Sequence, residues 1–126
     1  MQDTLQHITD RILQASKMGQ PLRFRGGGTK DFLGQSLQGE VLDTTPYSGI
    51  LSYEPSELVI TVRCGTPLAE VEAALAQKGQ CFAFEPPHFG KGATIGGMVA
   101  AGLSGPARAS VGTVRDFVLG ARVING

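Results

Sequence analysis

The segment LRFRGGGTK, residues 22–30, decides how this chain is read, because a short strand runs straight into three glycines. Leu22–Phe24 has the composition of a strand. Gly26, Gly27 and Gly28 expose consecutive backbone N–H groups and tolerate positive φ, so they can form a concave nest for a phosphate or pyrophosphate. Thr29 adds a hydroxyl donor and Lys30 adds positive charge. The alternative is a flexible surface loop.

A second glycine-rich segment, GATIGG, covers residues 92–97. Thr94 is a suitable N-cap for a helix that begins at Ile95. Gly96 and Gly97 then lie in the first turn, where each costs about 1 kcal/mol of helix stability relative to alanine. A first turn without side chains lets an anion approach the helix N-terminus. The alternative is tight packing of the helix through glycine, but the small residues continue through 100–102, which favours the binding interpretation.

The elements between these loops follow from hydrophobic periodicity. Residues 3–18 predict an amphipathic helix, with Gly19 after it as a stop signal. LVITVR, residues 58–63, predicts a strand, and Thr66 and Pro67 open a helix as its cap and first residue. Residues 81–84 predict the next strand. We therefore expect a β-α-β unit over 58–84 with a parallel, right-handed crossover. The segments 39–43 and 50–53 are only weakly patterned. The buried face of the second helix is expected to hold Leu68, Val71 and Leu75.

The last part of the chain predicts one more strand, Val114–Ile124, after an irregular loop over 85–94. It is followed by Asn125-Gly126, a dipeptide typical of hairpin turns. Because no residue follows this turn, we expect the chain to be the front part of a larger domain.

Composition narrows the class of protein. The chain has 126 residues, 41% apolar and 17% charged, with zero formal net charge and 6% aromatic residues. These values predict one soluble globular domain and argue against nucleic-acid binding. The sequence shows no secretory signal and no membrane-spanning run. Cys64 and Cys81 are predicted to be reduced core thiols, and His7 to lie on a helix surface; neither His7 nor His88 belongs to a metal or triad pattern.

Two common nucleotide motifs are absent. The Rossmann spacing G-x-G-x-x-G does not follow a strand, and no G-K-[ST] completes a Walker A motif. Four other stretches, RFRGGGTK (23–30), GATIGG (92–97), AAGLSGPAR (100–108) and VGTVRDFVLGARVING (111–126), together resemble the FAD-binding domain of the vanillyl-alcohol-oxidase/p-cresol-methylhydroxylase superfamily. Within it, the chain is most similar to the FAD-binding subunits of bacterial glycolate oxidases (glycolate dehydrogenases). The resemblance covers nearly the whole chain from Pro21 onward.

This resemblance implies an α+β fold in which FAD lies extended between two subdomains. Residues 1–87 would form the first, small α/β subdomain, and 88–126 the start of a second one, truncated here. The residues implied in cofactor binding are Gly26, Gly27, Gly28, Thr29, Lys30, Pro87, Gly92, Ala93, Thr94, Gly96, Gly97, Ser104, Gly105, Arg108 and Asp116. For Arg108 and Asp116 the alternative is a surface ion pair. No catalytic residue is assigned, since substrate-binding groups are expected beyond residue 126.

The resemblance also implies an activity: oxidation of a 2-hydroxy acid, glycolate to glyoxylate, by hydride transfer to FAD. Covalent members of the superfamily often have His after the glycine loop; here Thr29 stands there, so non-covalent FAD is expected. The implied partners are other subunits of a glycolate oxidase complex, with an iron–sulfur subunit as a candidate. The implied location is the cytoplasm, peripheral to the inner membrane through those partners. The alternatives are an FAD-dependent reductase of a peptidoglycan precursor and an assembly module without flavin.

Overall fold

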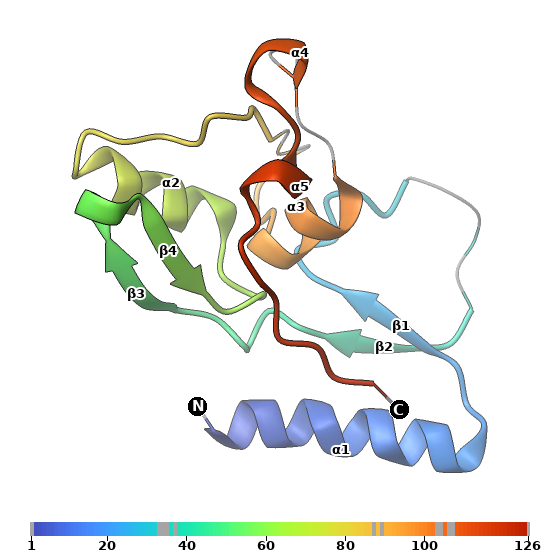
Figure 1. Ribbon diagram of the computed structural model, residues 1–126. Coiled ribbons are helices and arrows are strands. Elements are labelled where there is room, and N and C mark those ends of the chain that lie inside the picture. Colours follow the sequence, from blue (N-terminus) through green and yellow to red (C-terminus); the bar gives the residue numbers. More distant parts are fainter. Residues whose placement is uncertain are drawn as a thin grey trace.

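The computed structural model describes residues 2–32, 36, 38–86, 88, 90–102, 105 and 108–125, with only the backbone at residues 108 and 109. Helices and strands follow one another in a mixed order, and the strands form two separate two-stranded sheets (Figure 1). The fold is therefore α+β, as the family resemblance implied. The elements are α1 (Gln2–Met18), β1 (Leu22–Arg25), β2 (Glu40–Asp43), β3 (Ile50–Glu54), η1 (Pro55–Glu57), β4 (Val59–Val62), α2 (Leu68–Ala76), α3 (Ile95–Ala101), α4 (Arg108–Val111) and α5 (Val114–Phe117).

The first sheet places the first glycine loop. β1 and β2 run parallel, with Leu22 opposite Glu40 and Arg25 opposite Asp43. Both strands therefore end at the same edge, and the three glycines leave β1 at that edge. The predicted strand at 22–24 is confirmed. The segment 39–43, whose pattern was too weak for a prediction, contains β2.

The second sheet corrects the predicted β-α-β unit. β4 pairs antiparallel with β3, its predecessor in the chain, across the one-turn helix η1. Leu58 closes that connection in the left-handed region, at φ 58°. The β-branched residues of 58–63 identified the strand correctly. They carry no information about its partner, and so the expected parallel crossover is wrong.

Residues 81–84 do not form the strand that the sequence predicted. Phe82 and Phe84 instead stack on each other with ring centroids 5.0 Å apart, and Phe84 also approaches Phe117 of α5 at 5.6 Å. This segment is thus held by side-chain packing, without a ladder of backbone hydrogen bonds. Apolar alternation in a short run does not distinguish these two outcomes.

The main hydrophobic core lies between α2, α3 and the β3–β4 hairpin. The predicted buried face of α2, Leu68, Val71 and Leu75, is confirmed. These side chains share one cluster with Phe84, Ala93, Ile95, Met98 and Val114, and Tyr53, Ile60, Val62 and Phe82 pack against it. The core therefore joins α2 to the start of α3, where the second glycine segment lies.

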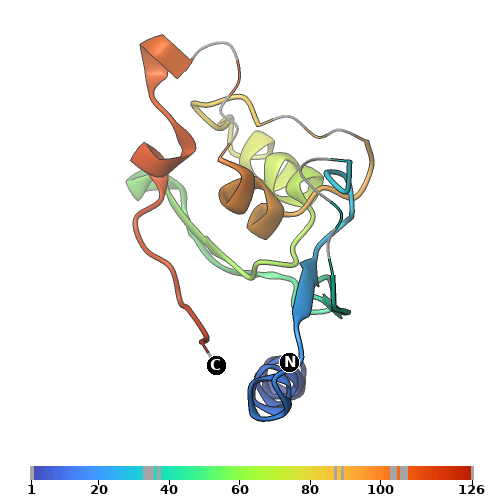
Figure 2. The same cartoon turned by 90° about the vertical axis from the view of Figure 1, so that its right-hand side faces the viewer.

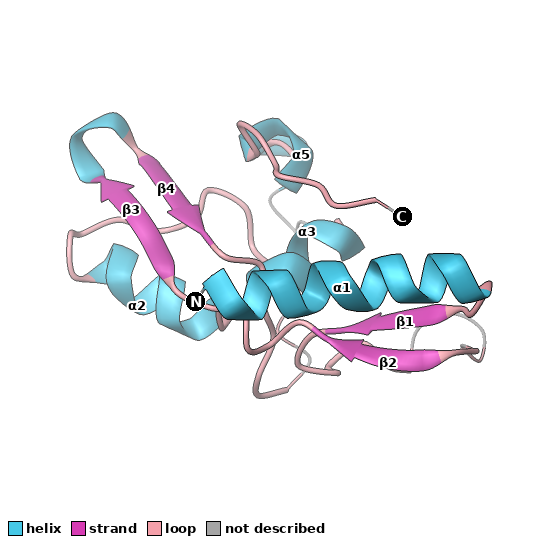
Figure 3. Cartoon of the chain, turned by 90° about the horizontal axis from the view of Figure 1, so that it is seen from below, coloured by secondary structure: helices cyan, strands magenta, loops and turns pink. Residues whose placement is uncertain are grey.

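The N-terminal helix confirms its prediction and lies at the edge of the molecule. Figure 2 views α1 end-on below the rest of the fold, and Figure 3 shows it running alongside β1 and β2. Its buried residues are Ile8 and Ala15, and His7 is exposed as expected. Arg11 links the helix to β2 through an exposed ion pair with Glu40, 3.1 Å from Nη2 to Oε2.

The C-terminal segment departs from its predicted strand. Val114–Phe117 forms the short helix α5, and residues 118–125 continue without regular structure. The Asp116 carboxylate accepts hydrogen bonds from the Thr113 N–H at 2.7 Å and from the Thr113 hydroxyl at 3.0 Å. This local pairing favours a helical turn at the point where the apolar residues alone predicted a strand.

One buried threonine ties three parts of the fold together. The Thr66 hydroxyl donates to the Arg63 carbonyl at 2.6 Å and accepts from the Gly49 N–H at 2.9 Å. Its carbonyl accepts from Ile95 N–H at 2.9 Å. Thr66 was predicted to be the side-chain cap of α2. That prediction is wrong, because the hydroxyl serves the loops on either side of the hairpin and α2 has no side-chain cap.

We predict that Thr66→Val lowers the free energy of unfolding by about 1–3 kcal/mol, because it leaves the partly buried Gly49 N–H without an acceptor. Urea denaturation of the full-length protein measures this change. Thr61→Val is the matched control. Thr61 is exposed on β4, so its replacement should change stability by no more than about 0.5 kcal/mol. Equal losses in both variants would contradict the role assigned to Thr66.

Candidate functional site

The two glycine segments predicted from the sequence touch each other. A Cβ added to Gly27 would lie 1.7 Å from the Gly92 carbonyl oxygen, and one added to Gly26 would lie 2.6 Å from Thr94 Oγ1. No side chain fits at either position while the segments keep this contact. The structure thus brings residues 26–27 and 92–94, far apart in the sequence, to one place beside the carboxyl end of β1.

The start of α3 confirms the predicted cap. Thr94 is buried, and its hydroxyl accepts from the Gly97 N–H at 3.1 Å. The Ile95 and Gly96 N–H groups donate to the carbonyls of Thr66 and Cys64, at 2.9 Å and 2.8 Å. The first three amides of the helix therefore already have acceptors within the protein, and an anion could reach them only by sharing those donors.

The absence of a side chain at Gly96 is explained by packing within the fold. A Cβ there would meet the Cβ and the carbonyl oxygen of Cys64, each at 2.9 Å. This is the tight packing through glycine that the sequence left open as an alternative. At Gly97 the nearest atom to an added Cβ is Thr94 Oγ1, at 3.2 Å, so that position is less crowded.

The first glycine loop offers free donors. Among the residues that the structure describes, the backbone N–H groups of 26–30 have no hydrogen-bond acceptor. Gly27 is exposed, and Thr29 and Lys30 are half-buried in the following turn. Consecutive unpaired amides beside a strand end can donate hydrogen bonds to several phosphate oxygens. The donor set thus fits a pyrophosphate, which is the central group of a flavin dinucleotide.

The loop also carries an ion pair that the sequence analysis missed. Arg25 donates from Nε and Nη2 to Oδ2 of Asp31, at 3.1 Å and 3.0 Å. This pairing raises the pKa of Arg25, so the guanidinium is charged at any physiological pH. Nearby, the hydroxyl and amide of Thr45 lower the pKa of Asp43 at the end of β2. The sequence feature that could have indicated this ion pair is the placement of two opposite charges, Arg25 and Asp31, on either side of the glycines.

Of the remaining predicted site residues, the structure describes Gly105 and Asp116 in full and Arg108 through its backbone. Gly105 contacts Glu85, since a Cβ added at Gly105 would lie 2.5 Å from the Glu85 Cβ. Asp116 caps α5 as described above. Of Arg108 the structure describes the backbone, within α4. Pro87 and Ser104 lie outside the described residues.

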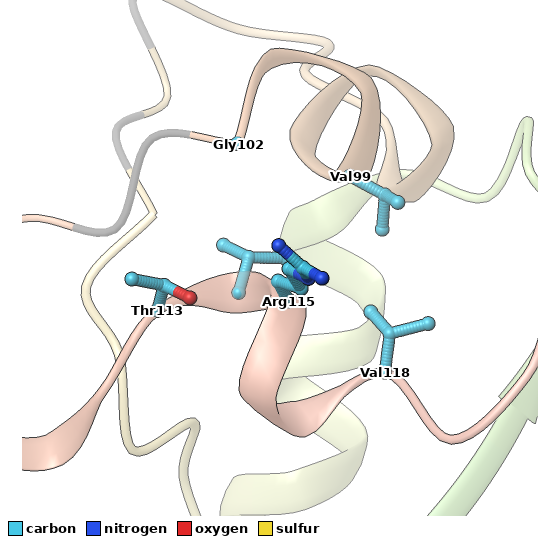
Figure 4. Close-up of a pocket in the computed structure, with 6 residues that line it drawn as sticks. Val99, Gly102, Thr113, Arg115 and Val118 are labelled. Carbon is cyan, nitrogen blue, oxygen red and sulfur yellow. The ribbon is translucent and has the colours of Figure 1, made fainter.

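A hollow of about 480 Å³ lies between α3 and α5. Figure 4 shows Val99 on α3 and, across the hollow, Thr113, Arg115 and Val118 from the segment that holds α5. The lining is mostly apolar, with Arg115 as its charged member. It is formed by Val99, Gly102, Thr113, Val114, Arg115 and Val118.

The cysteines and His88 add no metal site. Cys64 and Cys81 are free but exposed, so the prediction of core thiols is wrong. Partial burial of its sulfur still raises the pKa of Cys64. His88 Nε2 lies 3.1 Å from Glu72 Oε1. Within the described ranges, no three His, Cys, Asp or Glu side chains gather closely enough to hold a metal ion.

The geometry defines a cofactor-binding α+β domain whose glycine loops meet at a strand end. Comparison with known families makes this specific. The model of the FAD-binding domain family matches residues 3–126, and the chain belongs to that family. FAD is therefore the cofactor of this domain, and the resemblance drawn from the sequence motifs is confirmed.

Two curated relatives extend the comparison. The chain is 50% identical over 124 residues to "Glycolate oxidase subunit GlcE" of Escherichia coli, covering 98% of this chain and 35% of that protein. It is 37% identical over 113 residues to "D-2-hydroxyglutarate dehydrogenase" of Pseudomonas putida, covering 83% of this chain and 11% of that protein. The chain thus spans about a third or less of each relative. In the part of the chain that the structure describes, no helix is long and apolar enough to cross a membrane.

We predict that Gly27→Ala separates the two glycine segments, because the new methyl group would overlap the Gly92 carbonyl. The free energy of unfolding should fall by roughly 1–3 kcal/mol, the range for overpacked positions. This differs from the simplest expectation for a ligand-facing glycine, which is loss of the ligand with an intact fold. Urea denaturation of the full-length protein measures the change.

Gly120→Ala is the control for this prediction. Gly120 has no atom within 4 Å of an added Cβ and no positive φ, so its replacement should leave stability unchanged. Unchanged stability of Gly27→Ala would show that the contact between the two segments is not required.

Proposed function

We propose that this chain is the FAD-binding part of a flavoenzyme that oxidises a 2-hydroxy acid, with glycolate as the substrate and glyoxylate as the product. The observation that carries the proposal is the row of unpaired amides at 26–30, joined to the second glycine segment, in a chain of the FAD-binding family. The reaction is supported by the relatives, since both of their names describe oxidation of 2-hydroxy acids.

In this proposal the chain's own residues bind and orient the cofactor. Gly26, Gly27, Gly28, Thr29 and Lys30 hold the pyrophosphate. Gly92, Ala93, Thr94, Gly96 and Gly97 line the adjoining stretch, and Pro87, Ser104, Gly105, Arg108 and Asp116 shape the remainder of the pocket. When bound, FAD supplies the acceptor for a hydride from the α-carbon of the substrate. The protein contributes position and charge, and we assign no catalytic residue within this chain.

We further propose that the flavin is bound without a covalent link. Thr29 follows the glycine loop, and a threonine hydroxyl is a poor nucleophile compared with the histidine that many covalent members have there. Acid precipitation of the holoprotein should therefore release all flavin into the supernatant. Flavin retained in the pellet would contradict this.

The arrangement of the whole protein is proposed on the same basis. Residues 1–87 belong to one subdomain and 88–126 begin a second, with FAD between them. The hydrophobic core draws on residues from both sides of that boundary, which would fix the two parts against each other. Partner subunits of a glycolate oxidase complex, with an iron–sulfur subunit as a candidate, would take the electrons onward. Association through them would place the protein at the inner face of the cytoplasmic membrane.

The proposed reaction predicts that glycolate bleaches the flavin absorption band of the full-length holoprotein without oxygen, as the flavin is reduced. D-2-hydroxyglutarate, the compound in the name of the second relative, is the comparison substrate. Acetate is the control, because it lacks the α-hydroxyl group. Faster bleaching by glycolate than by D-2-hydroxyglutarate supports the assignment. A flavin that no 2-hydroxy acid reduces, although it is bound and reducible by dithionite, would overturn the reaction but leave FAD binding intact.

A further inference from the structure

Arg25 lies at the point where β1 becomes the first glycine loop. Its carbonyl accepts from the Thr44 N–H at 3.0 Å, which fixes its backbone at the carboxyl end of the parallel pair. Its side chain turns back over the loop. A Cβ added to Gly28 would lie 2.2 Å from Arg25 Nη2, so the guanidinium rests against the bare face of that glycine. Gly28 has φ +72°, in the left-handed region, so the backbone turns at this residue, next to the Arg25 side chain.

Asp31 holds the guanidinium in this place through one edge only. Nε and Nη2 share the carboxylate oxygen Oδ2, while Nη1 has no acceptor in the part of the chain that the structure describes. The two side chains are 45% and 57% exposed, and exposed ion pairs contribute little to stability. Stabilisation of the fold therefore does not account for the pair. Its effect is to hold a charged guanidinium beside the amides of 26–30, which have no acceptor among the described residues.

We propose that Arg25 binds the FAD pyrophosphate through its open Nη1 edge, and that Asp31 is the positioning residue that holds it there. The proposal rests on the FAD-binding function proposed above. A planar guanidinium matches phosphate oxygens with paired donors, and such charge-assisted bonds are stronger than those from neutral amides. The amides at the start of α3 are already engaged, so a cation at the first loop supplies the charge that the helix terminus does not. Anchoring by Asp31 reduces the entropy lost when the ligand binds.

The test measures the FAD dissociation constant of full-length apoprotein by flavin fluorescence at several sodium chloride concentrations. Arg25→Gln should weaken FAD binding by roughly 10- to 100-fold at low salt, as expected for loss of a hydrogen bond to a charged group. It should also reduce the dependence of binding on salt, because one screened charge contact is gone. A purely structural role would weaken binding by the same factor at every salt concentration.

Arg11→Gln is the matched control. It removes the same charge and breaks a similar exposed ion pair, between α1 and β2, away from the glycine loops. It should leave the dissociation constant within about twofold, since distant exposed charges are largely screened. Arg25→Lys keeps the charge but not the paired donors of the guanidinium. Its FAD dissociation constant should lie between those of wild type and Arg25→Gln. This variant also serves if Arg25→Gln does not fold, which circular dichroism would show.

The outcomes separate the two proposals. Wild-type protein that does not bind FAD overturns the proposed function. Wild-type protein that binds FAD while Arg25→Gln binds equally well, or while Arg25→Gln loses affinity by the same factor at all salt concentrations, overturns the role of Arg25 alone. Equal losses in Arg25→Gln and Arg11→Gln overturn it as well.

Discussion

The segment Cys64–Leu68 fixes the second glycine segment in space, and the candidate site depends on it. Cys64 O accepts from Gly96 N at 2.8 Å, and Leu68 N donates to Ala93 O at 2.7 Å. On its other side, the same segment donates from Gly65 N to Tyr47 O at 2.8 Å. One short stretch of backbone therefore connects the start of α3 to the turn after β2. Because buried backbone groups must be paired, these bonds leave the loop little freedom to move.

This constraint explains why glycines gather here and what they leave for a ligand. The second segment, held in place, lies so close to residues 26–27 that neither can carry a side chain. Some of these glycines therefore lack a side chain because the two loops contact each other there, and not because FAD binds there. In the proposed binding mode, the outer side of the first loop remains for the cofactor. There the amides of 26–30 have no acceptor among the described residues, and Arg25 lies over Gly28. In that proposal, packing and cofactor binding use different sides of the same glycines.

The sequence predicted the local elements better than their partners. The helix over 3–18, the strand at β1 and the Thr94 cap follow from periodicity and from the chemistry of single residues, which are local. The β-α-β unit failed because pairing is decided at long range: β4 met β3 across a one-turn helix, and residues 81–84 packed through two phenylalanines. The strand predicted at 114–124 failed because Asp116 pairs with Thr113, a local bond that apolar patterning does not register.

The sequence located the two glycine segments of the candidate site but did not indicate the ion pair beside them. Glycine runs identified both loops, and the family resemblance supplied FAD. The pairing of Arg25 with Asp31 depends on how the chain turns at Gly28. The α3 amides are hydrogen-bonded within the protein because the carbonyl of Cys64 and its neighbours lie beside them. Neither arrangement follows from composition. Hydrogen exchange of full-length protein with and without FAD measures whether the first glycine loop binds the cofactor. We expect the amides of 26–30 to become protected when FAD binds, and those of 95–97 to be protected in both states. Unchanged exchange at 26–30 on binding FAD would contradict it.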